Sequence, residues 1–178
     1  MIDYDCSLEQ SIPSNAFHQT ADLPTHPFFN TSGFYPFMRY SQVTLSNDPN
    51  DFIIVYGVNY VATGKATYSN IGVFGADIYN SIGAISNLDF NGTADARLPG
   101  NANVKYPYVY KITRHANGDS HSFEVPTGPG AYDIRLDQTL FIQWRSYLEV
   151  ATKTGPSYSE IVYDRDIKFD PKRPSEKA

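Results

Sequence analysis

The stretch Phe52-Ile-Ile-Val-Tyr-Gly-Val-Asn-Tyr-Val61 decides the fold class, because it is the most apolar part of the chain and alternates with a period of two. Apolar residues occupy both of its faces, which predicts a central strand that is covered on both sides. The turn-forming residues 47–51 precede it, and Ala62-Thr-Gly-Lys65 follows it. Residues 66–74 then predict a second central strand, which we expect to form a hairpin with the first.

Working outward, the same period continues through short segments that are separated by turns. Further strands are predicted around Val43 and Leu45 and over 108–114, 120–125, 139–148 and 161–169. The Asn117-Gly118 pair predicts a hairpin between two of them. No convincing helix exceeds two turns. Regularly spaced short strands indicate an all-β, two-sheet, antiparallel, jelly-roll-like sandwich, with a closed β-barrel as the alternative.

The chain divides into three parts by composition. Residues 1–33 hold three prolines and little periodicity, and we interpret them as an irregular N-terminal arm. Residues 34–170 form the single β-sandwich domain, and 171–178 are a polar tail. A chain of 178 residues buries roughly 70% of its unfolded surface, so its core needs no disulfide staples.

Charge and composition exclude several function classes. The chain carries 14 Lys and Arg against 19 Asp and Glu, a net charge of −5, which argues against nucleic acids and anionic membranes as partners. Its longest apolar run, 52–56, is far shorter than a membrane span. The single cysteine, Cys6, forms no internal disulfide. No signal peptide is visible at the N-terminus, so a cytoplasmic location is the default expectation.

The polar face of the 139–148 strand is the first candidate site. Gln143, Arg145 and Tyr147 alternate with the core-facing Leu140, Ile142 and Trp144. An arginine between a glutamine and a tyrosine is suited to holding a carboxylate or phosphate by forked donation. Tyr56 and Tyr68, together with Asn59 and Tyr60, lie on the predicted central strands and are candidates for an opposite wall. Ordinary aromatic packing is the competing interpretation.

Histidines and paired carboxylates are weaker candidates. His115 and His121 flank the Asn117-Gly118 turn and share a face only if its loop has three residues, so we predict no metal site. Asp164 and Asp166 share a face of the last strand. Two such carboxylates suit acid–base chemistry or calcium, but we favour a solvated edge strand.

Three functions fit these residues. The favoured one is a binding or accessory module for a small anionic or aromatic ligand at Arg145, because no nucleophile–base pair is readable. The second is a small hydrolase or lyase that uses Tyr and Arg with an Asp or a His, for which His18 and His26 in the arm are free enough in position. The third is a self-assembling protein that forms homo-oligomers through its arm. No cofactor motif is present in the sequence.

Part of the sequence resembles a known family. Asp48-Pro-Asn-Asp51, an apolar strand, Tyr60-Val-Ala-Thr-Gly64 and then Tyr68-Ser-Asn-Ile-Gly-Val-Phe74 resemble a bacterial β-sandwich domain of unknown function, often the C-terminal half of larger proteins. Leu140-Phe-Ile-Gln-Trp-Arg-Ser-Tyr147, Gly155-Pro156 and Glu160-Ile161 extend the likeness over roughly residues 36–169. The resemblance implies the fold and no particular activity.

Overall fold

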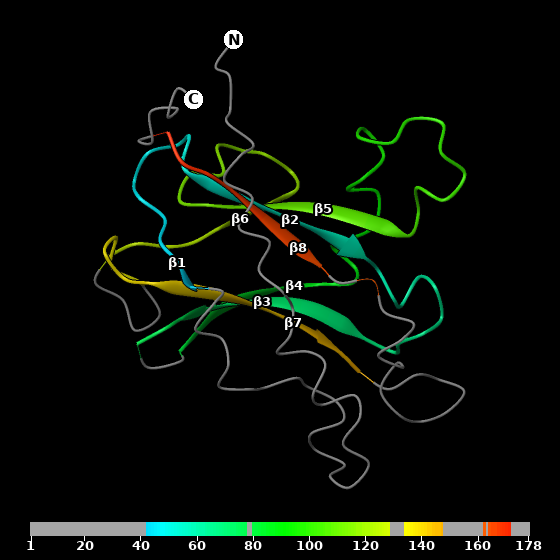
Figure 1. Ribbon diagram of the computed structural model, residues 1–178, viewed down its shortest axis with the longest axis horizontal. Coiled ribbons are helices and arrows are strands. Elements are labelled where there is room, and N and C mark those ends of the chain that lie inside the picture. Colours follow the sequence, from blue (N-terminus) through cyan, green and yellow to red (C-terminus); the bar gives the residue numbers. More distant parts are fainter. Residues whose placement is uncertain (1–41, 78–79, 129–133, 148–161, 163, 172–178) are drawn as a thin grey trace, which may run out of the picture.

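A computed structural model describes residues 42–77, 80–128, 134–147, 162 and 164–171 (Figure 1). These residues form strands and turns, and none of them belongs to a helix that could cross a membrane. The strands are β1 (Gln42–Val43), β2 (Phe52–Val58), β3 (Ser69–Gly75), β4 (Ser81–Ser86), β5 (Pro107–Thr113), β6 (Ser122–Glu124), β7 (Leu140–Ser146) and β8 (Arg165–Phe169).

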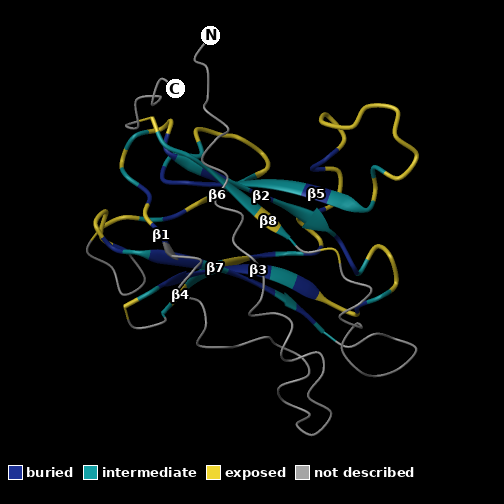
Figure 2. Cartoon of the chain, in the orientation of Figure 1, coloured by how far each residue is buried: buried dark blue, intermediate teal, exposed yellow. Residues whose placement is uncertain are grey.

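The strands form two stacked sheets, in the orders β1-β7-β3-β4 and β6-β5-β2-β8. Neither sheet closes on itself, so the β-sandwich is confirmed and the barrel alternative is wrong; the jelly-roll connectivity stays a prediction. The core lies between the sheets, where the buried faces of the strands meet (Figure 2). Its largest contributors include Ile53, Val55, Ile71, Val73 and Leu140.

The predicted hairpin between β2 and β3 is wrong. Both strands are central as expected, but β2 pairs with β5 and β8, while β3 pairs with β4 and β7. The cause lies at buried Asn59, whose N–H donates to the Tyr106 carbonyl at 2.7 Å. Its side-chain oxygen accepts from the N–H groups of Val61 and Ala62 at 3.2 and 3.3 Å. The backbone bond ends the β2–β5 ladder, and the side-chain bonds close the turn by which the chain leaves this sheet.

The Asn117-Gly118 turn is present, but the strands around it are not a hairpin. Both residues have positive φ (51° and 79°), and the Asp119 N–H donates to the Ala116 carbonyl at 2.9 Å. However, β5 and β6 run parallel, with Lys111 opposite Ser122. The chain leaves the sheet before the turn, because the side chain following β5 is drawn into the interior.

That side chain is Arg114, which links the connections at this end of the sandwich. Its Nε donates to the Leu45 carbonyl at 3.3 Å and its Nη1 to the Pro126 carbonyl at 2.9 Å. Its Nη1 and Nη2 also donate to the carbonyls of Ile134 and Arg135, at 3.3 and 3.2 Å. Burial lowers the pKa of Arg114, and nearby Asp51 partly offsets this. One cation therefore satisfies four carbonyls from two connections.

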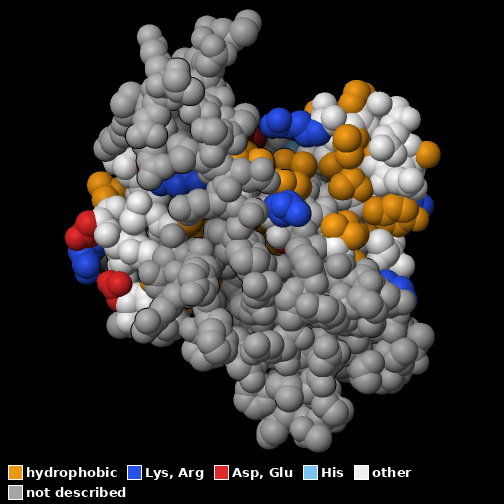
Figure 3. Space-filling model, viewed as in Figure 1, with side chains coloured by type: hydrophobic (Ala, Val, Ile, Leu, Met, Phe, Trp, Pro, Cys, Tyr) orange, Lys and Arg blue, Asp and Glu red, His pale blue; other side chains and the backbone are white. Residues whose placement is uncertain are grey.

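The connection between β4 and β5, residues 87–106, projects from the opposite end (Figure 1). Apolar side chains gather on its surface (Figure 3), and Leu88 and Leu98 are exposed. Its base is fixed because Phe90 is buried and stacks on Tyr108 with ring centroids 4.1 Å apart. The long connection is thus anchored to the core at its first turn.

Replacing Arg114 by lysine should destabilise the fold by about 2 to 4 kcal/mol, because one ammonium group cannot reach four carbonyls and leaves buried acceptors unpaired. Urea unfolding measures the loss. Arg135→Lys is the matched control, since this side chain is 70% exposed and its replacement should cost within about 0.5 kcal/mol. Equal losses in the two variants would contradict the role of Arg114.

Candidate functional site

Four of the five predicted ligand-binding residues come together at one end of the sheet that contains β7. Leu140 and Trp144 belong to the core, so Gln143 and Arg145 lie on the outer face of β7, as the alternation predicts. Tyr147 follows β7, and its N–H donates to the carbonyl of Tyr68 at 2.8 Å. These residues lie beside the start of β3.

Arg145 is oriented by two neighbours on the outer face. Its Nε and Nη2 donate to Gln143 Oε1 at 3.3 and 3.1 Å. Its guanidinium carbon lies 5.3 Å from the centroid of the Phe74 ring. Within the described residues no carboxylate forms an ion pair with Arg145. The Nη1 of Arg145 makes no hydrogen bond with the described residues.

Two tyrosines and an asparagine complete the group. The rings of Tyr68 and Tyr147 meet edge to face, 5.2 Å apart at 72°. Asn70 lies directly opposite Arg145 in the β3–β7 ladder, and its Nδ2 donates to the Tyr68 hydroxyl at 3.2 Å. The Oδ1 of Asn70 is buried without a hydrogen-bond partner among the described residues. We call the following residues the Arg145 cluster: Tyr68, Asn70, Phe74, Gln143, Arg145 and Tyr147.

Sequence reasoning missed Asn70 and Phe74, because their place beside Arg145 depends on the pairing of β3 with β7. The segments adjoin only through the register of two strands that are far apart in sequence. Correct pairing would have identified both residues, since Asn70 lies directly opposite Arg145 and Phe74, opposite Phe141, lies on the same face of β3 as Asn70.

Tyr56 does not join this cluster. It lies on β2 in the other sheet, opposite Val109 and Arg165. Its neighbour Val55 faces the core, so Tyr56 lies on the outer face of that sheet. Asn59 and Tyr60, considered with it as an opposite wall, are buried in the interior. The expected opposite wall is therefore not formed by these three residues.

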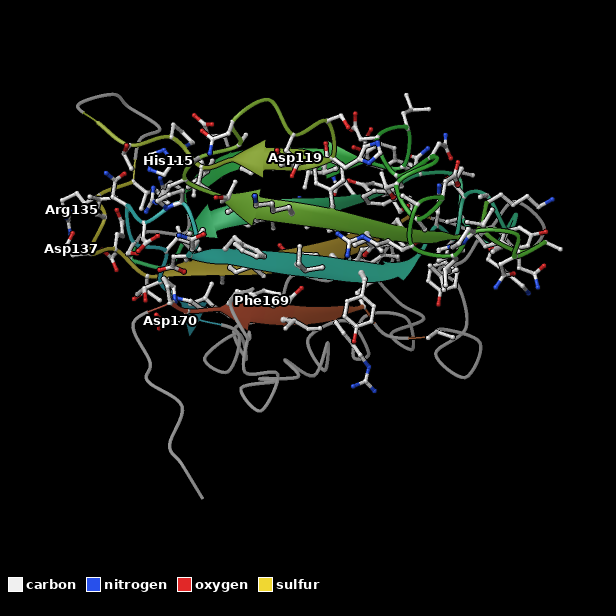
Figure 4. The ribbon with its side chains drawn as sticks, turned by 90° about the horizontal axis from the view of Figure 1, so that it is seen from above. His115, Asp119, Arg135, Asp137, Phe169 and Asp170 are labelled. Atoms are coloured by element: carbon white, nitrogen blue, oxygen red, sulfur yellow. The ribbon has the colours of Figure 1, made fainter. Side chains whose placement is uncertain are left out.

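The histidines of the described residues also lie away from the cluster. His115 is at the end of the sandwich where β8 finishes at Phe169 (Figure 4), and its Nε2 is 3.0 Å from both the carbonyl and Oδ1 of Asn47. His121 lies beside Tyr110, with ring centroids 6.5 Å apart. In the described parts of the chain, no three His, Cys, Asp or Glu side chains form a group that could hold a metal. His18 and His26 lie outside the described residues.

The carboxylates of the last strand form a second candidate group. β8 is an edge strand, as predicted, and pairs with β2. The solvated-face interpretation of its acids is wrong, however, because Asp166 lies opposite the core residue Val55 and so faces inward. Asp164 also turns inward, since its Oδ1 accepts a 2.7 Å hydrogen bond from the buried Tyr108 hydroxyl.

Gly57 makes room for this carboxyl group. A Cβ on Gly57 would lie 1.6 Å from Asp164 Oδ1 and 3.0 Å from the Tyr108 hydroxyl oxygen. The carboxyl group therefore rests on bare backbone, and it also accepts a hydrogen bond from the backbone of Val58. The cross-strand row Tyr108–Gly57–Asp164 forms because the middle residue has no side chain.

Burial sets the protonation of this group. Desolvation raises the pKa of Asp164 well above its usual value, although the Tyr108 hydrogen bond opposes the shift. Desolvation raises the pKa of Asp166 from 3.8 to about 7. The pKa of Tyr108 is raised as well, first by its own burial and then by Asp164. Burial thus favours the protonated form of both carboxyl groups.

Comparison with known proteins adds no further constraint. No family model, no curated protein and no solved structure matches the chain. The resemblance of residues 36–169 to a bacterial β-sandwich domain thus stays a prediction. The evidence for a function is therefore the Arg145 cluster and the carboxyl groups of Asp164 and Asp166.

Replacing Tyr108 by phenylalanine should destabilise the protein by about 1 to 3 kcal/mol, because it leaves Asp164 without its side-chain donor inside the fold. Tyr110→Phe, two residues along the same strand, is the control and should cost within about 0.5 kcal/mol. Thermal and urea unfolding compare the two. Indistinguishable losses would show that the Tyr108–Asp164 hydrogen bond contributes nothing.

Proposed function

We propose that this protein is a binding module that holds a small anionic ligand at the Arg145 cluster. The observation that carries the proposal is an arginine that Gln143 and Phe74 orient but that no described carboxylate neutralises. Side chains with many rotamers lose entropy when they bind, and an arginine already held in place loses less. The cluster is therefore preorganised for a negative group.

The chemistry of the cluster narrows the ligand class. Gln143 uses one edge of the guanidinium, and the remaining N–H groups form a fork that matches a carboxylate or a phosphate. Tyr68 is 37% exposed and adjoins Tyr147, so a flat apolar part of the ligand has aromatic surface beside the charge.

The two alternative functions have less support from the described residues. Acid–base chemistry at Arg145 needs a nearby His or Asp, but His115 and His121 lie at the other end of the sandwich and in the other sheet. Tyr108 is fully buried, which keeps a substrate from its hydroxyl. Self-assembly through the arm concerns residues outside those described.

Binding is tested with benzoate and phenyl phosphate as probes and with benzamide as the uncharged counterpart of benzoate. At millimolar concentrations we expect at least one of the two anions to raise the melting temperature, while benzamide leaves it unchanged. Calorimetric titration should then show that Arg145→Gln weakens the affinity at least about tenfold, and that Arg145→Lys gives a smaller loss.

Arg135→Gln controls for a general loss of positive charge, because Arg135 is exposed and lies at the far end of the sandwich. It should bind the anions as the wild type does. The proposal fails if neither anion binds, or if Arg145→Gln, shown by circular dichroism to be folded, binds them with unchanged affinity.

A further inference from the structure

We propose that β8 is a pH-sensitive latch, an edge strand that docks against β2 while the carboxyl groups of Asp164 and Asp166 are protonated and loosens as they lose their protons. The inference is independent of the ligand proposed for the Arg145 cluster. It rests on where β8 places its charged side chains.

The inward positions of the last strand are all ionisable. Asp166 lies opposite Val55, and Lys168 lies opposite Ile53, both of which are fully buried core residues. Asp164 occupies the preceding inward position, over Gly57. Burying ionisable side chains costs free energy. The docking of β8 against β2 is therefore less stable than that of an edge strand with apolar inward side chains.

Polar contacts at each end hold β8 in place. At its start, Tyr108 donates to Asp164, and the Tyr60 hydroxyl bonds the backbone of Val162. At its finish, Lys168 pairs with the buried Asp51 at 3.2 Å and donates to the Thr44 carbonyl. Asp166 lies between these anchors, and burial alone is the cause of its raised pKa. Within the described residues, no contact therefore stabilises the ionised form of Asp166 while β8 is docked.

The sign of the pH dependence follows from the raised pKa of Asp166. The docked strand retains the proton up to about pH 7, whereas the released strand loses it near the ordinary value of 3.8. The docked state thus binds more protons, so its stability is complete at low pH and falls as the pH rises from about 4 to about 7. Asp164, raised by the same cause, acts in the same direction.

The other groups on this inner face do not reverse this dependence. Tyr108 and Tyr60 are phenols, and the pKa of Tyr108 is raised further, so it stays neutral. Lys168 is engaged by Asp51. From the facing sheet, Trp144 packs against Tyr60 and carries no charge. The full burial of Tyr108 also argues for a structural switch here rather than a catalytic acid.

Hydrogen exchange followed by mass spectrometry tests the latch in the full chain, with rates corrected for intrinsic exchange at each pH. Protection of peptides covering 165–169 should fall between about tenfold and a hundredfold from about pH 5 to about pH 8. Peptides covering β3 and β7 serve as the internal reference and should keep their protection. In Asp166→Asn, the pH dependence of β8 protection should be clearly smaller than in the wild type, and in the double variant Asp164→Asn/Asp166→Asn it should be less than about threefold over the same range.

Asp137→Asn, which removes an exposed carboxylate, is the matched control and should behave as the wild type. If Asp166→Asn does not fold, Asp164→Asn takes its place and should flatten the dependence in part. The proposal is overturned if β8 protection in the wild type does not change with pH, if all strands lose protection together, or if the folded Asp variants keep the full dependence.

Discussion

The buried guanidinium of Arg114 is the interaction on which the arrangement of the strands depends. A carbonyl that is removed from water needs a donor, and the connections at this end of the sandwich bring four carbonyls to the guanidinium of Arg114. Arg114 supplies the donors. Its side chain turns inward directly after β5, and β6 runs parallel to β5 instead of forming a hairpin with it.

At the opposite end of the sandwich, Asn59 is the buried polar residue that hydrogen-bonds the connections. Its side chain donates to the Asn87 carbonyl at 3.2 Å and accepts from the turn that follows β2, so one buried amide joins the β2–β3 and β4–β5 connections. Apolar burial stabilises the layers between these ends. Directional hydrogen bonds from Arg114 and Asn59 hold the connections at the two ends.

The contrast between local apolar patterning and long-range hydrogen bonds explains which features could be predicted from the sequence. Period-two alternation is a local property, so the strands, the central place of β2 and the two faces of β7 were all predictable. Strand pairing is not local. The Asn117-Gly118 turn formed with its expected positive φ values, yet the hairpin failed, because Arg114 bonds residues up to 69 positions away. For the same reason Arg145 was predictable as a candidate, whereas its neighbour Asn70 on β3 was not.

Both clusters lie at the same end of the sandwich, on the two strands that residues 148–161 connect. The Arg145 cluster is at the end of β7, and Asp164 directly precedes β8. A ligand whose affinity differs between docked and loosened β8 must therefore shift the pH at which β8 loosens, and the pH must shift the affinity by the same factor. A ligand that binds both states equally shifts neither. Coupling thus depends on whether the position of Tyr147 changes with β8, because Tyr147 is the cluster residue nearest to that strand along the chain.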